Sequence, residues 1–101
     1  MYLTLKLDMK DEKIGVALEY SGNIPTILAV ARGVLFEHLI SIARDHNITI
    51  YENPDLAQVL SQVPVGTEIP EALFRAVSEV LAYCYRINAD FRAKLDGMGI
   101  L

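Results

Sequence analysis

The first twenty residues alternate apolar and polar side chains with the period of a β-strand. Two segments, 2–7 and 14–20, show this alternation. Their alternating apolar residues are Leu3, Leu5 and Leu7 in the first segment and Ile14, Val16 and Leu18 in the second. Because side chains two residues apart share one face of a strand, both segments are predicted to be half-buried strands. The charged stretch 8–13 between them is expected to be a turn or loop, and a hairpin of the two strands is one expected arrangement, although no tight-turn pair such as Asn-Gly specifies it.

A third strand and a helix are predicted next. The segment 26–32 (TILAVAR) is apolar and partly β-branched, and the turn-forming cluster 21–25 precedes it, so we expect a strand buried on both faces. After Gly33, apolar residues recur with helical spacing and predict a helix over 34–46. The residues expected to face inward are Leu35, Phe36, Leu39, Ile40, Ile42 and Ala43.

The middle of the chain is predicted to hold a short strand and a short helix. Asn47 suits the end of the preceding helix, and 48–51 (ITIY) is predicted to be a strand. Strand, helix and strand would then form a parallel crossover. Asn53 and Pro54 are typical of a helix start, as N-cap and first residue, and the helix is expected to run over 54–62. Its expected inward residues are Leu56, Ala57, Val59 and Leu60.

The last helix is expected to begin at Pro70. Its apolar stripe runs at spacings of three and four residues, which predicts a buried helix face. The stripe consists of Leu73, Val77, Val80, Leu81, Cys84 and Ile87, with Phe91 and Leu95 as a continuation to about Lys94. The whole pattern predicts an α/β fold, a small mixed β-sheet of about four strands covered by about three to four helices.

Composition and charge exclude several classes of protein. The chain has 101 residues, the length of one domain, and hydrophobic residues make up 52% of it. Its net charge is −4 and its nine basic residues are scattered, so we expect no nucleic-acid binding. No apolar run reaches the roughly 18 to 20 residues of a membrane span, so no direct membrane insertion is expected. Without a signal peptide in 1–7, the protein is predicted to be cytoplasmic.

Three blocks of sequence resemble the cytoplasmic domain of the FlhB and YscU family, the export switch of flagella and type III secretion systems. They are IGVALEY (14–20), ARGVLFEHLISIARDHNITIYENPDLA (31–57) and VPVGTEIPEALFRAVSEVLAYCYRI (63–87). The blocks occur in the family's order. The resemblance implies a family domain over 14–96, an N-terminal strand and charged loop over 1–13, and a tail over 97–101. It also implies association with the membrane export apparatus.

The family's self-cleavage motif, Asn-Pro-Thr-His, is absent from this chain. Aligning IGVALEY with the family places Lys10, Asp11, Glu12 and Lys13 at the four motif positions. Cleavage in the family needs an Asn side-chain amide that attacks its own backbone carbonyl before Pro, and Lys10 followed by Asp11 cannot do this. The resemblance therefore implies a domain that does not cleave itself. Because Met1 begins only a few residues before the strand that resembles the family, a free-standing version of the domain is expected. The four residues remain candidates for binding a partner, against the plainer interpretation of a solvated loop.

Two other places carry Asn and Pro. Asn53 and Pro54 are followed by Asp55 rather than Thr-His, and 23–26 (NIPT) has Ile24 between Asn and Pro. We therefore expect a helix start at the first and a turn at the second.

Histidine, cysteine and tyrosine side chains elsewhere in the chain are further candidate sites. His38 and His46 are eight residues apart, too far for one metal ion without further ligands, so surface histidines are expected. The lone Cys84 is predicted to be a buried thiol. Of Tyr83 and Tyr85, which face different sides of the last helix, at least one is expected to be exposed as a partner anchor or to be half-buried.

A pair of acidic residues flanks Pro70. Glu68 and Glu71 are expected to stabilise the N-terminal end of the last helix, with acid–base catalysis as a remote alternative.

The resemblance implies a protein that acts by binding other proteins. Its expected partners are export-apparatus proteins, export substrates and a length-control factor, in a flagellar or an injectisome system. Neither a cofactor nor a metal is expected. The alternatives are an interaction module unrelated to export and a small hydrolase, for which the sequence offers no nucleophile–base pair, metal set or glycine-rich loop.

Overall fold

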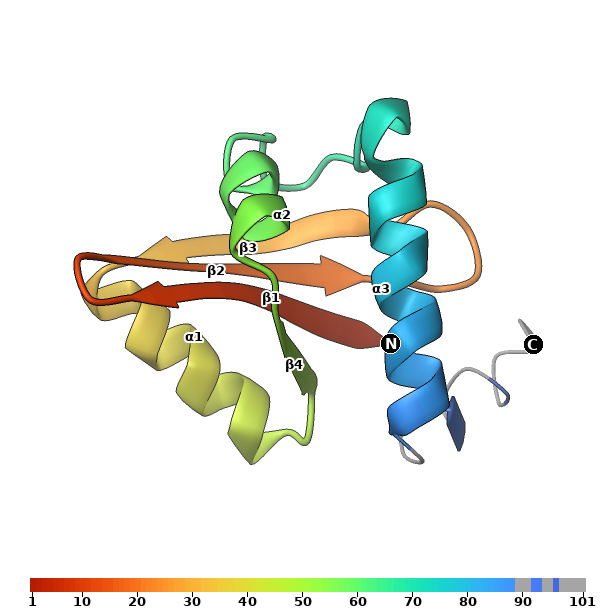
Figure 1. Ribbon diagram of the computed structural model, residues 1–101, viewed down its shortest axis with the longest axis horizontal. Coiled ribbons are helices and arrows are strands. Elements are labelled where there is room, and N and C mark those ends of the chain that lie inside the picture. The colour runs from red at the N-terminus through yellow and green to blue at the C-terminus, as the bar shows by residue number, and fades with distance from the viewer. Residues whose placement is uncertain (89–91, 94–95, 97–101) are drawn as a thin grey trace.

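A computed structural model describes residues 1–88, 92–93 and 96, and shows a four-stranded sheet with helices on both faces (Figure 1). The strands are β1 (Tyr2–Met9), β2 (Glu12–Glu19), β3 (Thr26–Arg32) and β4 (Thr49–Glu52), in the order β3-β2-β1-β4. β1 pairs antiparallel with β2 and parallel with β4, and β2 pairs antiparallel with β3. The predicted mixed α/β fold is confirmed.

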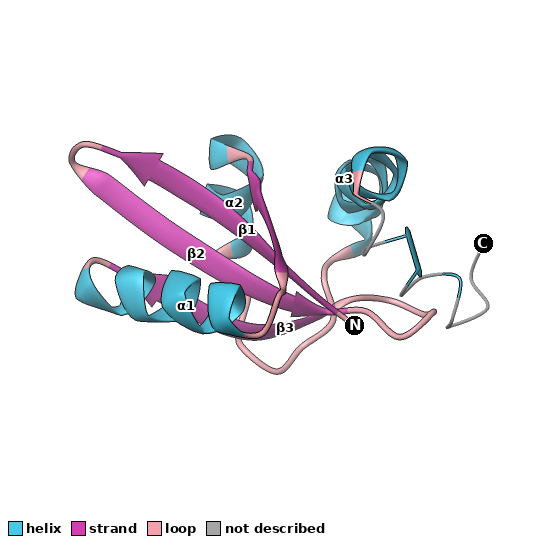
Figure 2. Ribbon diagram, turned by 90° about the horizontal axis from the view of Figure 1, so that it is seen from below, coloured by secondary structure: helices cyan, strands magenta, loops and turns pink. Residues whose placement is uncertain are grey.

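Helices α2 (Pro54–Leu60) and α3 (Phe74–Ile87) cover one face of the sheet, and α1 (Val34–Asp45) covers the other (Figure 2). The register of β1 and β2 aligns their apolar faces, with Leu3 opposite Leu18 and Leu5 opposite Val16. These side chains are buried beneath α2 and α3 in one core, as the alternation predicts. The α1 side has a smaller buried set, Phe36, Ile40 and Ala43.

The expected hairpin between β1 and β2 is present, but its connection is much shorter than the expected turn or loop over 8–13. Met9 pairs with Glu12, so only Lys10 and Asp11 form the turn. Neither turn residue has a positive φ, so the turn requires no Asn-Gly pair. The strands extend further than predicted because Asp8 lies opposite Lys13 on the paired strand, where their charges attract at 3.3 Å.

β3 has the predicted bounds but lies at a sheet edge, so the expectation of burial on both faces is wrong. Leu28 is 41% exposed, and a register shift interrupts the pairing near Ala17 and Leu18. The predicted crossover is confirmed in direction, because β3 and β4 both run parallel to β1. The two strands lie at opposite edges, so the connection through α1 passes over two strands rather than joining neighbours.

The helices bury fewer apolar residues than their stripes predict. Predicted inward residues that are exposed instead are Leu35 (62%), Ile42 (54%), Val59 (49%) and Ile87 (63%). On the α1 side this happens because one helix lies alone on its sheet face and buries only a narrow stripe. Gly15 allows that helix close approach, since a Cβ there would lie 2.8 Å from Leu39 Cδ2. Asn47 ends the segment with a φ of 55°, as predicted.

The last helix begins later than expected. Pro70 precedes a single 3₁₀ turn, η1 (Glu71–Leu73), and α3 starts at Phe74. Its buried residues are Val77, Val80 and Cys84. The predicted continuation through Phe91 and Leu95 lies outside the described residues. Within the described part of the chain, no helix is long and apolar enough to cross a membrane.

The predicted N-cap of α2 is confirmed and can be tested. Asn53 Oδ1 accepts a hydrogen bond from the Leu56 backbone N–H at 3.2 Å, and Pro54 occupies the first turn. Asn53→Ala leaves that N–H without its acceptor, so we expect a loss of about 1 kcal/mol in unfolding free energy, measured by urea denaturation. Asn53→Asp keeps a side-chain acceptor and is expected to stay near the wild-type value. Equal losses in both variants would contradict the capping role.

Candidate protein-interaction surfaces

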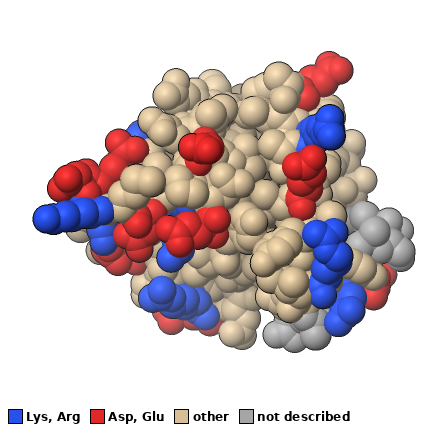
Figure 3. All heavy atoms as spheres, in the orientation of Figure 1, with Lys and Arg blue, Asp and Glu red and all other residues tan. Residues whose placement is uncertain are grey.

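Charged side chains of both signs gather at the end of the molecule where β1 and β2 join (Figure 3). Lys13 Nζ lies 3.3 Å from Asp8 Oδ1 and 3.3 Å from Glu37 Oε1, and 5.9 Å from the centre of the Phe36 ring. Hydrogen bonds to Asp8 and Glu37 raise the pKa of Lys13 above its ordinary value. Lys13 therefore stays protonated, and its ion pair with Glu37 connects the hairpin to α1.

The four residues expected at the cleavage-motif positions thus have different surroundings. Lys13 is engaged with its two carboxylate partners, whereas Lys10, Asp11 and Glu12 are exposed at the tip. Among the described residues, no group of three or more His, Cys, Asp or Glu side chains could hold a metal ion. His38 and His46 are both exposed, and the Nδ1 of His46 lies 3.0 Å from the Ile42 carbonyl oxygen.

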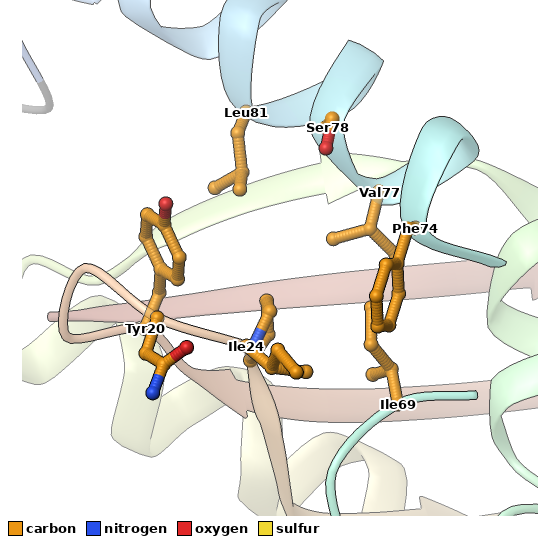
Figure 4. Close-up of a pocket in the computed structure, with 9 residues that line it drawn as sticks. Tyr20, Ile24, Ile69, Phe74, Val77, Ser78 and Leu81 are labelled. Atoms are coloured by element: carbon orange, nitrogen blue, oxygen red, sulfur yellow. The ribbon is translucent and has the colours of Figure 1, made fainter. Parts of the chain in front are cut away.

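A small apolar pocket lies between α3 and the turn that joins β2 to β3 (Figure 4). Its volume is about 110 Å³. It is lined by Tyr20, Asn23, Ile24, Pro25, Ile69, Phe74, Val77, Ser78 and Leu81. Ile69 and Val77 are almost fully buried and belong to the core, while Ser78 and Asn23 are exposed at the rim. Figure 4 shows the Tyr20, Ile24, Phe74 and Leu81 side chains around the central space.

Backbone hydrogen bonds hold the walls of this pocket in place. The Ile69 N–H donates to the Pro25 carbonyl at 3.0 Å, and the Ile27 N–H donates to the Thr67 carbonyl at 2.9 Å. Gly66, with a φ of 89°, returns a hydrogen bond of 2.7 Å to the Ile27 carbonyl. The segment before α3 is therefore fastened to the start of β3, which positions Ile69 beneath the helix.

The chemistry of the pocket suits binding rather than catalysis. Its lining is apolar apart from the Ser78 hydroxyl, the Asn23 amide and the Tyr20 phenol. An apolar cavity of roughly 150 Å³ accepts a benzene molecule in proteins, so this slightly smaller space suits one apolar side chain. Anchor residues of protein partners occupy desolvated pockets of this kind, and an apolar pocket with a few polar groups at its rim is a candidate binding site.

The pocket was not predicted from the sequence. The cluster 21–25 by itself predicts only a turn, and the apolar stripe on α3 by itself predicts only a face buried in the core. The sequence signal for the pocket is Ile24, because it is a large apolar residue inside a turn. A turn does not by itself bury such a side chain. Only the contact between this turn and α3 converts Ile24 and Leu81 into pocket walls.

The opposite face of the sheet carries a second apolar hollow. It lies between α1 and the sheet, with a volume of about 300 Å³, and its lining includes Tyr2, Leu28, Leu39, Ile42 and Ile48. This hollow is wider and more open to solvent than the pocket beside α3.

The remaining candidates behave largely as predicted. Cys84 is buried, and burial raises the pKa of its thiol, so it is a weak nucleophile. Tyr83 is 39% exposed and packs edge-on against Tyr51, whereas Tyr85 is half-buried. Glu71 lies in the first turn of η1, as expected for a residue that stabilises a helix start.

Residues 12–84 match the family described as FlhB HrpN YscU SpaS Family. The matched residues make up most of the chain. The chain belongs to this family. The match includes Glu12 and Lys13 but begins after Lys10 and Asp11.

Three relatives illustrate the relationship. The flagellar biosynthetic protein FlhB of Aquifex aeolicus is 32% identical over 74 residues, which cover 69% of this chain and 21% of that protein. The uncharacterized protein YlqH of Bacillus subtilis is 27% identical, over 78% of this chain and 88% of that protein. The crystal structure of the cytoplasmic domain of FlhB from Shewanella putrefaciens has a TM-score of 0.75 at 26% identity, covering 86% of this chain and 70% of that one.

These coverages show which part of the family the chain shares. It spans about a fifth of the length of FlhB but most of the length of YlqH. The resemblance to the FlhB and YscU cytoplasmic domain is confirmed, together with its fold. The activity and partners of a whole FlhB protein are not carried over by a match to one domain.

Proposed function

We propose that this chain is a non-cleaving counterpart of the export-switch domain in flagellar or type III protein export, and that it acts by binding other proteins. Membership of the FlhB family supports the export context. The observation that carries the mode of action is the apolar pocket between α3 and the turn at Ile24 and Pro25. In this proposal the pocket receives an apolar side chain from an export substrate.

The hairpin tip is the second surface in this proposal. Lys10, Asp11 and Glu12, which the alignment of IGVALEY is expected to place at the family's motif positions, are exposed, so they would contact an export-apparatus protein. The bond between Lys10 and Asp11 would stay intact, because neither side chain provides the amide that cleavage needs. The protein would then occupy one switch state permanently, as a cytoplasmic protein that associates with the export apparatus at the membrane.

Photo-crosslinking in living cells tests the proposal directly. A photoreactive residue in place of Ser78, at the exposed rim of the pocket, is expected to form adducts with hook or filament proteins, identified by mass spectrometry. The matched control is Ser41, an exposed serine on α1, at the other side of the sheet. Adducts with export proteins from Ser78 but not from Ser41 would support the pocket.

Two crosslinking results would contradict the proposal. Equal adducts from both positions would show non-specific contact, and adducts with proteins outside export would favour an interaction module that has left the export system. A deletion strain gives an independent readout, since we expect disturbed flagellar assembly or secretion. Normal flagella and secretion in that strain would count against an export role.

A further inference from the structure

The outer edge of β3 offers backbone groups to which another strand can add. β3 is a border strand, and among the described strands β2 is its one neighbour (Figure 2). On the outer side, the segment 66–69 pairs with the start of β3 through hydrogen bonds to Pro25 and Ile27. Within the described part of the chain, no backbone hydrogen bond continues this outer pairing beyond Ile27. Residues 28–32 therefore form an open strand edge.

The pairing with β2 determines which backbone groups point outward along this edge. The Gly33 N–H donates to the Lys13 carbonyl at 3.3 Å, directly after the pair of Arg32 with Ile14. Hydrogen-bonded and non-hydrogen-bonded pairs alternate along two antiparallel strands, so the backbone groups of Arg32 and Val30 point away from β2. Val30 therefore presents one N–H donor and one C=O acceptor at the middle of the open edge.

The side chains along and beside this edge are mostly apolar. Exposed strand edges are usually protected by charged side chains, proline or a covering segment, whereas residues 28–31 are Leu-Ala-Val-Ala. Leu28 is 41% exposed, and Val34, in the first turn of α1, is 77% exposed. Val65, which is 57% exposed, precedes Gly66, whose N–H bonds to β3. Exposed apolar side chains therefore lie next to the open edge at both of its ends.

A second copy of this chain fits the edge, because the edge is complementary to itself. In an antiparallel pair of two β3 strands centred on Val30, the two Val30 residues exchange both backbone hydrogen bonds. Ala29 of one copy then lies opposite Ala31 of the other. Because Ala29 pairs with Ala17 and Ala31 with Gly15 on β2, both alanine side chains are on the α1 side of the sheet. Their small size leaves the close approach of the two strands unobstructed.

The ends of the two strands are complementary as well. Gly33, with a φ of 59°, turns the chain from the strand into α1, so the pairing stops after Arg32. In the antiparallel arrangement, this turn of one copy lies beside the segment 65–69 of the other. Val34 of one copy and Val65 of the other are thereby brought into the same contact. The two-fold symmetry repeats this contact at the opposite end, so the assembly closes as a dimer.

We propose that two copies of this protein form a symmetric dimer through antiparallel pairing of their β3 strands. The two-fold axis of such a pair is perpendicular to the sheet, so both copies keep α3 on the same face of the shared sheet. The two apolar pockets beside α3 then open on one face of the dimer. A partner with two anchor residues would bind such a dimer more tightly than a single chain. The strand pairing itself does not depend on what the pocket binds.

Sedimentation velocity over a range of protein concentrations tests the dimer. With rising concentration, the protein is expected to shift from the 11.2 kDa mass of one chain to twice that mass. Leu28→Lys places a charge at the paired edge and is expected to weaken association about tenfold or more. A monomer mass that persists at about 1 mM protein would overturn the inference.

Ile87→Lys is the matched control for this substitution. Ile87 is also apolar, is 63% exposed and ends α3. The next residue, Asn88, donates a hydrogen bond to Thr49 on β4, so this position lies by the opposite border of the sheet. The control is expected to associate like the wild-type protein, and circular dichroism checks that both variants are folded. Equal weakening by the two lysines would overturn the β3 interface.

A cysteine at the centre of the pair tests the register. In the proposed dimer the two Cα atoms of residue 30 lie about 5.5 Å apart, a separation that a disulfide can bridge. Val30→Cys is expected to form disulfide-linked dimers under mild oxidation. Ile87→Cys, and the wild-type protein with its buried Cys84, are expected to remain largely unlinked. Equal crosslinking of Val30→Cys and Ile87→Cys would contradict the β3 pairing. Linked dimers that bind no export protein would count against the proposed function alone.

Discussion

Leu5→Ala is expected to lower the free energy of unfolding by about 3 to 5 kcal/mol. Leu5 is fully buried on β1, between β2 and β4, and it lies opposite Val16 in the core beneath α2 and α3. Truncation removes apolar contacts and leaves a cavity that the paired strands cannot close by moving. A domain of this size has about 5 to 15 kcal/mol of stability in total, so one substitution would remove a large share.

Urea denaturation measures this loss, with an unchanged slope as the sign that unfolding stays two-state. Leu35→Ala is the matched control, because Leu35 belongs to the predicted apolar stripe of α1 but is 62% exposed. We expect the control to stay within about 0.5 kcal/mol of the wild-type value. A large loss in the control would mean that the outer face of α1 is covered in solution, which would point to a partner or a second copy on that face.

Ser78→Arg is expected to abolish binding at the pocket, with at least a tenfold loss of affinity for the export protein that crosslinks there. Ser78 is exposed at the rim, so a longer charged side chain can project over the opening without entering the core. The arginine side chain would cover the space that an apolar side chain of the partner occupies. It would also place a charge beside that space, and an apolar side chain cannot solvate a charge. In cells, this variant should reproduce the phenotype of the deletion strain.

Ser41→Arg makes the same chemical change on α1, at an exposed position on the other side of the sheet. Both substitutions are at exposed helix positions, so both are expected to change stability by less than about 0.5 kcal/mol. Isothermal titration calorimetry with the purified export protein compares them. Equal binding by both variants would exclude the pocket as the binding site, and equal loss in both would show that added positive charge, rather than its position, weakens the complex.

The pocket and the charged hairpin tip, the two surfaces of the proposed function, lie at different ends of the molecule. The tip lies at one end of β1 and β2, and the pocket lies near the other end of β2, where Tyr20 follows the strand. The proposed function thus predicts that one partner can bind the tip while a second protein binds the pocket. Lys13 stabilises the tip through Asp8 and Glu37, so a substitution there would disturb the hairpin as well as any contact it makes.

Local sequence determined several elements that do not depend on distant contacts. The alternation in 2–7 and 14–20 specified which side chains face the core, because the period of a strand is independent of its neighbours. Asn53 capped its helix, and Asn47 ended the previous one, through bonds and backbone angles confined to a few residues. The three blocks that resemble the family were also recognisable from local sequence. Residues 12–84, which match the family, contain nearly all residues of these blocks.

Tertiary structure alone decided which apolar surfaces are covered. The composition of β3 is that of a buried strand, yet its place at the sheet edge leaves Leu28 exposed, and the single helix α1 leaves Leu35 and Ile42 in solvent. The pocket likewise depends on three segments distant in sequence, the turn at Ile24, the residues around Ile69 and one side of α3. Periodicity reports the faces of each element separately, whereas burial depends on how many neighbours pack against each face, and that number is a property of the assembled sheet and helices.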